Sequence, residues 1–162
     1  MPDVATTPSL NVVSSVAELH ALEGTHLGHS DWHDVTQQQV EEFADATGDH
    51  QWLHVDPERA KAGPFGTTIA HGYLVLSLTP HLLPQVVDFS GFAMVVNYGA
   101  EKLRFPAPTP VGSRIRLGAH LESVTEIPGG AQTELTLTFQ VEGAAKPSCV
   151  VRTVLRQYEE GS

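Results

Sequence analysis

Residues 72–83 restrict the fold of this 162-residue chain most, because they would form a helix that is apolar almost all round. A glycine opens the stretch, and the apolar side chains that follow are Tyr73, Leu74, Leu76, Leu78, Leu82 and Leu83. A helix without a polar face is buried rather than laid on a surface. Pro80 should kink it, because the proline ring removes the bond to the carbonyl four residues earlier.

The last third of the chain predicts what covers this helix. Strands are expected at residues 114–124, 133–141 and 148–158, with turns at Pro128-Gly129-Gly130 and at residues 143–147. Apolar and polar side chains alternate in the middle strand, where the apolar ones are Leu135, Leu137, Phe139 and Val141. Such alternation indicates an antiparallel sheet with one covered face. We therefore predict an α+β fold in which a long central helix packs against a curved sheet. Two further short strands are expected at residues 92–98 and 102–105.

Residues 49–55 are expected to form a tight loop between two helices. The first helix, at residues 36–47, has a capping-box pattern at its start and Gly48 as the left-handed residue that ends it. The second helix begins at Asp56-Pro57, an N-cap followed by proline at the first helical position. A loop held at both ends can keep an acid–base pair in place.

Two residues of this loop favour acid–base chemistry. Asp49 and His54 place a carboxylate and an imidazole five positions apart, and Gly72 begins the apolar helix. N–H groups in the first turn of a helix lack intrahelical partners and attract developing negative charge, and a glycine lets a carbonyl come close. Asp49 alone would indicate only a turn. Together with His54 and the pair His71-Gly72, it indicates proton transfer next to a carbonyl.

A longer motif occupies residues 43–78, FADATGDHQWLHVDPERAKAGPFGTTIAHGYLVLSL. It resembles the signature of the MaoC-like, or R-specific enoyl-CoA hydratase (hydratase 2), family of hotdog-fold proteins, and most closely the NodN-like branch found in actinobacteria. The resemblance continues in Asn97-Tyr98-Gly99 and in residues 102–108, so it spans roughly residues 25–120. It implies a single hotdog domain over residues 1–162, in which a curved antiparallel sheet wraps a long helix. Such units usually pair, and open sheet edges give a physical reason, so we expect a homodimer.

The resemblance also implies an activity. This is the reversible hydration of a trans-2-enoyl-CoA to an (R)-3-hydroxyacyl-CoA, with coenzyme A as part of the substrate and no separate cofactor. Asp49 and His54 match the catalytic pair that holds one water, and the N–H of Gly72 matches the oxyanion-hole donor. Two alternatives stay open: a dehydratase for acyl-carrier-protein substrates or another hotdog acyl-thioester enzyme, and a non-catalytic acyl-thioester binding protein. Retention of Asp49 and His54 counts against the binding protein.

Two departures from the family pattern bear on the substrate. Many members have Asn-Pro where Gln51 and Trp52 stand here, which leaves the catalytic pair intact but affects the expected acyl-chain preference. A polar helix residue that some members use near the thioester falls at Pro80, which has no donor, so Ser77 or Thr79 would have to replace it.

Charge limits the partners of the chain. The net charge is −10, and no lysine or arginine precedes Arg59. For want of a basic patch, nucleic acid is not expected as a partner, and the acidic front half disfavours an acidic carrier protein. We expect some of the cations nearest the proposed site in sequence to hold the nucleotide end of coenzyme A; these cations are Arg59, Lys61, Lys102 and Arg104.

Several residues of the motif admit other roles. Asp56 is better explained as a helix cap than as a catalytic group. His71, which we group with the substrate-binding residues, is expected to position neighbouring backbone through a ring hydrogen bond. Trp52 should form either a wall of the acyl pocket or a dimer contact. His50 and His54 are four positions apart, but no metal-ligand spacing accompanies them, so no metal site is expected.

The remaining features describe an ordinary domain. The length fits one domain that buries about 70% of its unfolded surface. The single cysteine, Cys149, lies in a Val-rich strand pattern and predicts a buried structural thiol in a reducing compartment. No apolar run approaches the ~20 residues of a membrane span, and no secretory signal is evident, so cytoplasm is expected. Residues 1–14 are expected to form a loose or docked tail, followed by a short helix from Ser15 to Gly24 and one strand within residues 25–35.

Overall fold

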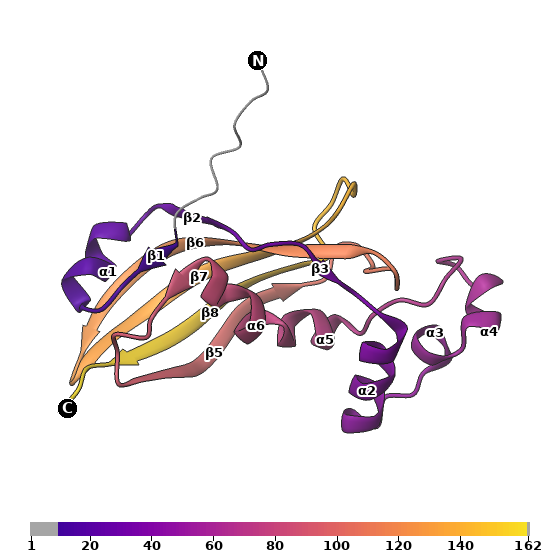
Figure 1. Cartoon of the computed structure of the whole chain (residues 1–162), viewed down its shortest axis with the longest axis horizontal. Coiled ribbons are helices and arrows are strands. Elements are labelled where there is room, and N and C mark those ends of the chain that lie inside the picture. The colour runs from indigo at the N-terminus through magenta and orange to yellow at the C-terminus, as the bar shows by residue number, and fades with distance from the viewer. Residues whose placement is uncertain (1–9, 162) are drawn as a thin grey trace, which may run out of the picture.

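The computed structural model describes residues 10–161 and consists of a curved sheet with short helices along it and at both of its ends (Figure 1). The helices are α1 (Val16–Leu22), α2 (Gln37–Thr47), α3 (Trp52–Val55), α4 (Pro57–Lys61), α5 (Gly72–Ser77), α6 (Thr79–Leu82) and the 3-10 helix η1 (Leu83–Gln85). The strands are β1 (Asn11–Val12), β2 (His26–His29), β3 (His33–Asp34), β4 (Val87–Asp88), β5 (Met94–Arg104), β6 (Arg114–Ile127), β7 (Gly130–Val141) and β8 (Cys149–Tyr158).

The main sheet has the strand order β2-β6-β7-β8-β5, its neighbouring strands are antiparallel, and β3 also pairs with β6. Strands β6 and β7 meet in a tight hairpin in which Ile127 pairs with Gly130, and Gly129 takes a φ of 80° that suits glycine. Burial alternates residue by residue along β7. The predicted antiparallel sheet with one covered face is therefore confirmed.

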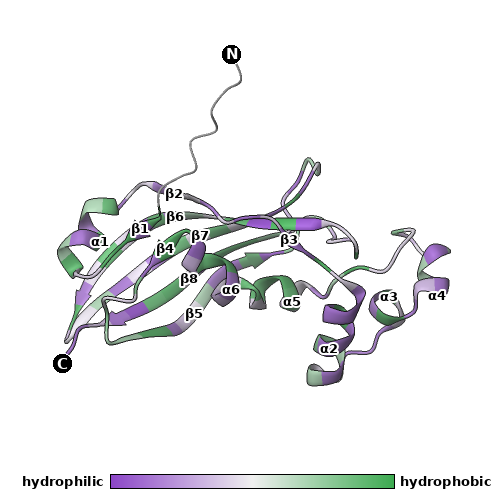
Figure 2. Cartoon of the chain, viewed as in Figure 1, coloured by the Kyte–Doolittle hydropathy of each residue, from purple (hydrophilic) through white to green (hydrophobic). Residues whose placement is uncertain are grey.

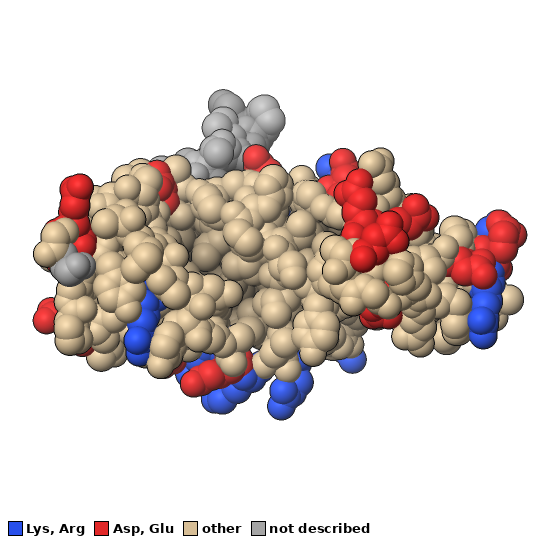
Figure 3. Space-filling view, turned by 90° about the horizontal axis from the view of Figure 1, so that it is seen from below, with Lys and Arg blue, Asp and Glu red and all other residues tan. Residues whose placement is uncertain are grey.

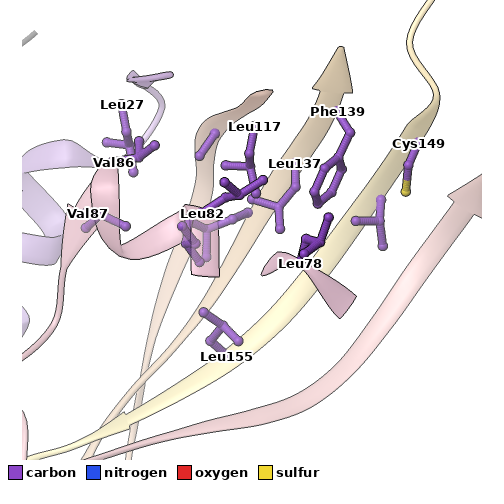
Figure 4. Close-up of a cluster of buried hydrophobic side chains, with 14 of the residues drawn as sticks. Leu27, Leu78, Leu82, Val86, Val87, Leu117, Leu137, Phe139, Cys149 and Leu155 are labelled. Carbon is purple, nitrogen blue, oxygen red and sulfur yellow. The ribbon is translucent and has the colours of Figure 1, made fainter. Parts of the chain in front are cut away.

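The core lies between this sheet and the segment α5–α6. Leu78 and Leu82 lie among Leu117, Leu137 and Phe139 of the sheet (Figure 4), and the last three side chains are fully buried. Figure 2 shows α5 as largely hydrophobic and the strands of the sheet as a mixture of hydrophobic and hydrophilic residues. Cys149 belongs to the same core, where burial raises the pKa of its thiol to about 12. A helical segment wrapped by a curved antiparallel sheet is the predicted α+β hotdog arrangement.

The predicted long helix is not continuous. It divides at Leu78 into α5 and α6, followed by η1. The division has a local cause, because Pro80 has no N–H to donate to the carbonyl of Leu76. The hydroxyl of Thr79 donates to that carbonyl instead, over 2.6 Å.

Three other boundaries differ from the sequence predictions. The strands expected at 92–98 and 102–105 are one strand, β5, with irregular register at Asn97/Gly99 and Glu101/Arg104. Residues 25–35 hold two strands, β2 and β3, instead of one. The predicted loop 49–55 contains a single helical turn, α3. Of the predicted loose or docked tail, Asn11 and Val12 are docked, because they form β1 and pair in parallel with β4; residues 1–9 of that tail lie outside the described residues.

Strand β5 forms an edge of the main sheet and is exposed along most of its length. Its exposed large apolar side chains are Met94, Val95 and Tyr98. Within residues 10–161, no helix has the length and apolar character needed to cross a membrane.

Candidate active site

The predicted acid–base residues lie on a short connection that helix ends hold in place. Gly48 ends α2 with a φ of 80°, and its N–H bonds to the carbonyl of Ala44 over 2.8 Å. Asp49 follows at once. On the other side, the carboxylate of Asp56 accepts the N–H of Arg59 over 3.0 Å and caps α4, as predicted. His54 lies between these two fixed points, on α3.

Asp49, His54 and His71 meet although they are far apart in sequence. Oδ2 of Asp49 lies 4.0 Å from Nε2 of His54 and 4.0 Å from Nε2 of His71. The side chain of Asp49 is 53% exposed, whereas the two histidines are buried. The site therefore has one solvent-facing carboxylate against an interior wall of two imidazoles.

A backbone hydrogen bond sets the tautomer of His54. Its Nδ1 lies 2.7 Å from the carbonyl oxygen of Ile69, which can only accept, so Nδ1 carries the proton. Nε2 is then the unprotonated nitrogen and presents its lone pair on the Asp49 side. Burial lowers the pKa of His54, and the neighbouring His71 lowers it further, while the bond to Ile69 and the charge of Asp49 act in the opposite direction. His54 is thus neutral at pH 7.

His71 makes the predicted ring hydrogen bond to backbone. Its Nε2 donates to the carbonyl of Asp49 over 2.9 Å, and its ring stacks on that of His54 with centroids 3.8 Å apart. Only 3% of His71 is exposed, and its Nδ1 has no partner among the described residues. His71 therefore contacts both members of the pair, one through backbone and the other through its ring.

The spacing of this cluster suits water better than a metal ion. Ligand atoms of Asp49, His54 and His71 lie within 4.8 Å of one another. Two ligand atoms of a tetrahedral zinc ion, each about 2.0 Å from the metal, lie only about 3.3 Å apart, and the Nε2 of His71 is already donating its proton to backbone. By contrast, hydrogen bonds of about 2.8 Å from one water to two acceptors 4.0 Å apart would meet at about 90°, close to the angle between the two O–H bonds of water.

Gly72 begins α5 directly after His71, so its N–H has no partner within the helix. A Cβ at this position would lie 2.9 Å from the ring of Phe105, which packs against the glycine. Any larger residue at this position would push the ring of Phe105 aside. The predicted oxyanion donor therefore lies beside an aromatic wall.

Two cavities lie along α5 and α6. The first, about 490 Å³, adjoins Gly72 and includes Phe65, Tyr73 and Phe105 in its wall. The second, about 780 Å³, lies between α5–α6–η1 and strands β5 and β8; its lining includes Leu76, Leu83, Phe92, Met94 and Leu155. Asp49 and His54 are in neither lining; the carboxylate of Asp49 is half-exposed to solvent, whereas His54 is buried.

The hydroxyls of Ser77 and Thr79 line the second cavity but are already bonded. Each donates to a carbonyl of its own helical segment, that of Tyr73 and that of Leu76 respectively, over 2.6 Å. In this geometry neither proton is available to replace the polar helix residue that Pro80 lacks.

The structure separates the predicted substrate-binding residues into two groups. The guanidinium of Arg59 lies over the ring of Trp52 at 4.5 Å, and that ring also packs on Gly63. Lys61 is bonded to Glu58 over 2.8 Å. Trp52 lines neither of the two cavities. His50, which the sequence spacing raised only as a metal ligand together with His54, bonds to Asp45 over 2.8 Å.

The other group, Lys102 and Arg104, lies on β5 next to Phe105. Arg104 donates to the carbonyl of Leu103 over 2.7 Å. Lys102 has a φ of 51° and is the one described non-glycine residue with positive φ, at an irregularity in the pairing of β5. Such irregularities redirect side chains at the edges of sheets.

Sequence reasoning missed Gln37 and Thr68, which border the site. Nε2 of Gln37 donates to the carbonyl of His54 over 2.8 Å, and the hydroxyl of Thr68 donates to Oε1 of Gln37 over 2.6 Å. Gln37 and Thr68 are 31 positions apart. Because no local pattern joins them, the sequence held no signal for this contact.

Comparisons with known proteins agree with this architecture. A model of the MaoC like domain matches residues 18–142. The chain belongs to the MaoC-like family. This MaoC-like protein is 51% identical to the 3-hydroxyacyl-thioester dehydratase Z of Mycobacterium tuberculosis over 148 residues, which cover 91% of the chain and 98% of the relative. It is 39% identical to nodulation protein N of Rhizobium leguminosarum over 143 residues, covering 83% and 85%. The predicted family, NodN-like relationship and hydro-lyase class are thus confirmed.

Solved structures confirm the fold of the MaoC-like chain. An R-hydratase from Pseudomonas aeruginosa superposes with a TM-score of 0.73 at 21% identity, covering 91% of this chain and 87% of that one. An (R)-hydratase from A. caviae gives a TM-score of 0.69 at 24% identity, covering 82% and 94%. At such low identity the likeness concerns the fold alone.

Proposed function

We propose that this protein reversibly hydrates a trans-2-enoyl-CoA to an (R)-3-hydroxyacyl-CoA. The observation that carries the proposal is the 4.0 Å gap between Oδ2 of Asp49 and the unprotonated Nε2 of His54. Both atoms are acceptors and their spacing fits one water that donates to each. The named activity of the Mycobacterium tuberculosis relative, a 3-hydroxyacyl-thioester dehydratase, supports the same chemistry.

The proposed hydration balances with these groups alone. The water oxygen bonds to the carbon β to the thioester, and an O–H bond of the water breaks as its proton passes to the Asp49–His54 pair. The π electrons of the double bond move toward the thioester oxygen, which becomes enolate-like beside the N–H of Gly72. The pair then returns one proton to the α carbon, so both side chains end as they began. General acid–base help of this kind contributes roughly 10²- to 10⁴-fold in rate, and one oxyanion donor about 10²- to 10³-fold.

The proposed substrate class rests on the two cavities along α5 and α6. The second cavity has a mainly apolar lining, and its two helix hydroxyls are bonded within the helix, which favours an acyl chain. The first cavity offers aromatic side chains, among them Phe105, which follows Lys102 and Arg104 of β5 in the chain, and it suits the carrier end of a thioester. Lys61 and Arg59, bonded to Glu58 and stacked on Trp52, are the weaker phosphate contacts in this proposal. No cofactor other than the coenzyme A of the substrate takes part.

The proposed assembly is a homodimer. Strand β5 is a long edge strand with an exposed apolar row, and such edges pair readily. Two solved structural relatives from Mycobacterium tuberculosis are described as complexes, the ChsH1-ChsH2 complex and the HadBC complex.

The test is the loss of enoyl-thioester absorbance when the purified protein meets crotonyl-CoA, with the configuration of the product read by a chiral assay. Asp49→Asn should lower kcat at least about 10²-fold. Asp45→Asn is the matched control. Asp45 is an exposed carboxylate near the end of α2, the helix that precedes Asp49, and it bonds to His50. Asp45→Asn should leave kcat unchanged.

The same assay separates the alternatives. Crotonyl-N-acetylcysteamine has the reacting thioester but no nucleotide, so a KM far above that of crotonyl-CoA would support recognition of coenzyme A. Hydration only of an acyl-carrier-protein thioester would favour the carrier-protein dehydratase. An absence of hydration with crotonyl-CoA, a longer enoyl-CoA and the carrier-protein thioester would leave the non-catalytic binding protein.

A further inference from the structure

We propose that Gln37 is a positioning residue for His54, an inference that rests on the proposed function. Its side-chain amide clamps the backbone of His54 to the segment that accepts the His54 ring proton. Gln37 is the first residue of α2, directly after the cap formed by Thr36, whose hydroxyl accepts the N–H of Gln39 over 3.2 Å. The cap fixes where α2 begins and with it the place of Gln37 (Figure 1).

The hydrogen bonds form a closed ring. Nδ1 of His54 donates to the carbonyl of Ile69 over 2.7 Å, and Ile69 is joined covalently to Thr68. The hydroxyl of Thr68 donates to Gln37 over 2.6 Å, and the amide of Gln37 donates back to the carbonyl of His54 over 2.8 Å. A closed ring of this kind holds the imidazole relative to its acceptor, because no member can move without lengthening a bond.

The chemistry of the ring fixes the orientation of the Gln37 amide. The backbone carbonyl of His54 can only accept, so the NH₂ of Gln37 must face it. The amide oxygen then faces Thr68, whose hydroxyl can donate. Thr68 is only 3% exposed, so water cannot readily replace the lost partner if Gln37 is removed.

The far side of the ring is rigid. The N–H of Val111 donates to the carbonyl of Thr68 over 2.9 Å, and the N–H of Ala70 donates to the carbonyl of Thr109 over 2.8 Å. Ile69 also forms a bridge with Pro110 and donates its own N–H to Leu53 over 3.0 Å. Residues 68–70 are therefore held like a strand, and Gln37 ties the single turn of α3 to this anchored segment.

The position of the His54 imidazole and its tautomer are linked. Only when Nδ1 donates to Ile69 does Nε2 present a lone pair toward Oδ2 of Asp49. The charged and titratable groups that face His54 are Asp49, on the preceding connection, and His71, stacked on its ring. Loosening the clamp frees the imidazole to exchange tautomers or turn, while the cavities along α5 and α6 stay as they are.

The experiment compares Gln37→Leu with Gln38→Leu. Gln38 is the next residue of the same helix and bonds on the surface to Glu42, so it controls for helix propensity and charge. With crotonyl-CoA, Gln37→Leu should lower kcat about tenfold and leave KM within about twofold, and Gln38→Leu should change neither. Nitrogen-15 NMR of the His54 ring should show one tautomer, protonated at Nδ1, in the wild type and in Gln38→Leu, and a mixture in Gln37→Leu.

Two further variants protect the test from a folding defect. Gln37→Glu keeps the length of the side chain and the acceptor for Thr68 but cannot donate to His54, so it should behave like Gln37→Leu. Thr68→Val keeps shape and removes the donor to Gln37, and its effect on kcat should be less than additive with that of Gln37→Leu. A single wild-type tautomer in both Gln37 variants, or a change in KM alone, would overturn the proposal. The NMR measurement needs no substrate, so it tests the clamp even where the proposed hydration fails.

Discussion

The sheet and the site are built in different ways. In β6, β7 and β8 the inward side chains are buried and each of these strands pairs along most of its length, so burial and hydrogen bonds between strands hold this region. Residues 37–72 instead form short helices at one end of the molecule (Figure 1), where acidic side chains gather on the surface (Figure 3). Single polar contacts connect them, such as Gln37 to His54 and His71 to Asp49.

The difference separates stability from activity. Apolar burial in the sheet is non-directional and contributes most of the folding free energy. The contacts around Asp49 and His54 are directional and contribute little to stability individually, but each fixes an angle or a tautomer. Variants in the sheet should therefore change unfolding more than kcat, and variants in the site should do the reverse.

The variant Phe139→Ala should give the largest effect and tests whether the sheet core contributes to stability alone. Phe139 is fully buried in β7 against the α5–α6 segment, and its truncation should lower the free energy of unfolding by about 3–5 kcal/mol through lost burial and a new cavity. Denaturant unfolding measures this loss. Activity per folded molecule, measured well below the melting temperature, should stay within about twofold of wild type. A large fall in kcat for the folded variant would show that the sheet core also sets the geometry of the site.

The pH dependence of activity tests the protonation state of His54 in the site. Burial lowers the pKa of His54 below its ordinary value of 6.5, whereas the hydrogen bond to Asp45 raises the pKa of the exposed His50 above it. The neutral ring of His54 is the form that accepts a proton of the water, so activity should be lost as pH falls through a midpoint below 6.5, about tenfold per pH unit beyond it. NMR titration should find His50 titrating above His54. The reverse order would remove the basis for a neutral His54 at the site.

Local features of both regions were predictable from the sequence, but contacts between residues far apart in the chain were not. Alternation in β7 and the caps at Thr36, Asp56 and Gly48 depend on neighbours in sequence, and all were predictable. β1 was not, because two residues become a strand only by pairing with β4, far along the chain.

The residues of the site also fall into a predictable and an unpredictable group. Asp49 and His54 are close in sequence and could be named together. The stacking of His71 on His54 and the hydrogen-bond ring through Gln37 and Thr68 arise only when residues 15 to 31 positions apart come together in the fold.

The smallest effect is expected where the two regions meet, at the joint between α5 and α6. Thr79→Val removes the hydroxyl that donates to the carbonyl of Leu76, the group that Pro80 leaves without a partner, and keeps the shape of the side chain. The free energy of unfolding should fall by about 1 kcal/mol, measured by denaturant. Thr79 also lines the second cavity, so the kcat/KM values for crotonyl-CoA and for a longer enoyl-CoA should be measured in the same variant. Because the hydroxyl is bonded within the helix, its removal should leave the ratio of these two values unchanged. A change in that ratio without a loss of stability would mean that Thr79 turns toward the substrate, and the joint would then belong to the site rather than to the core.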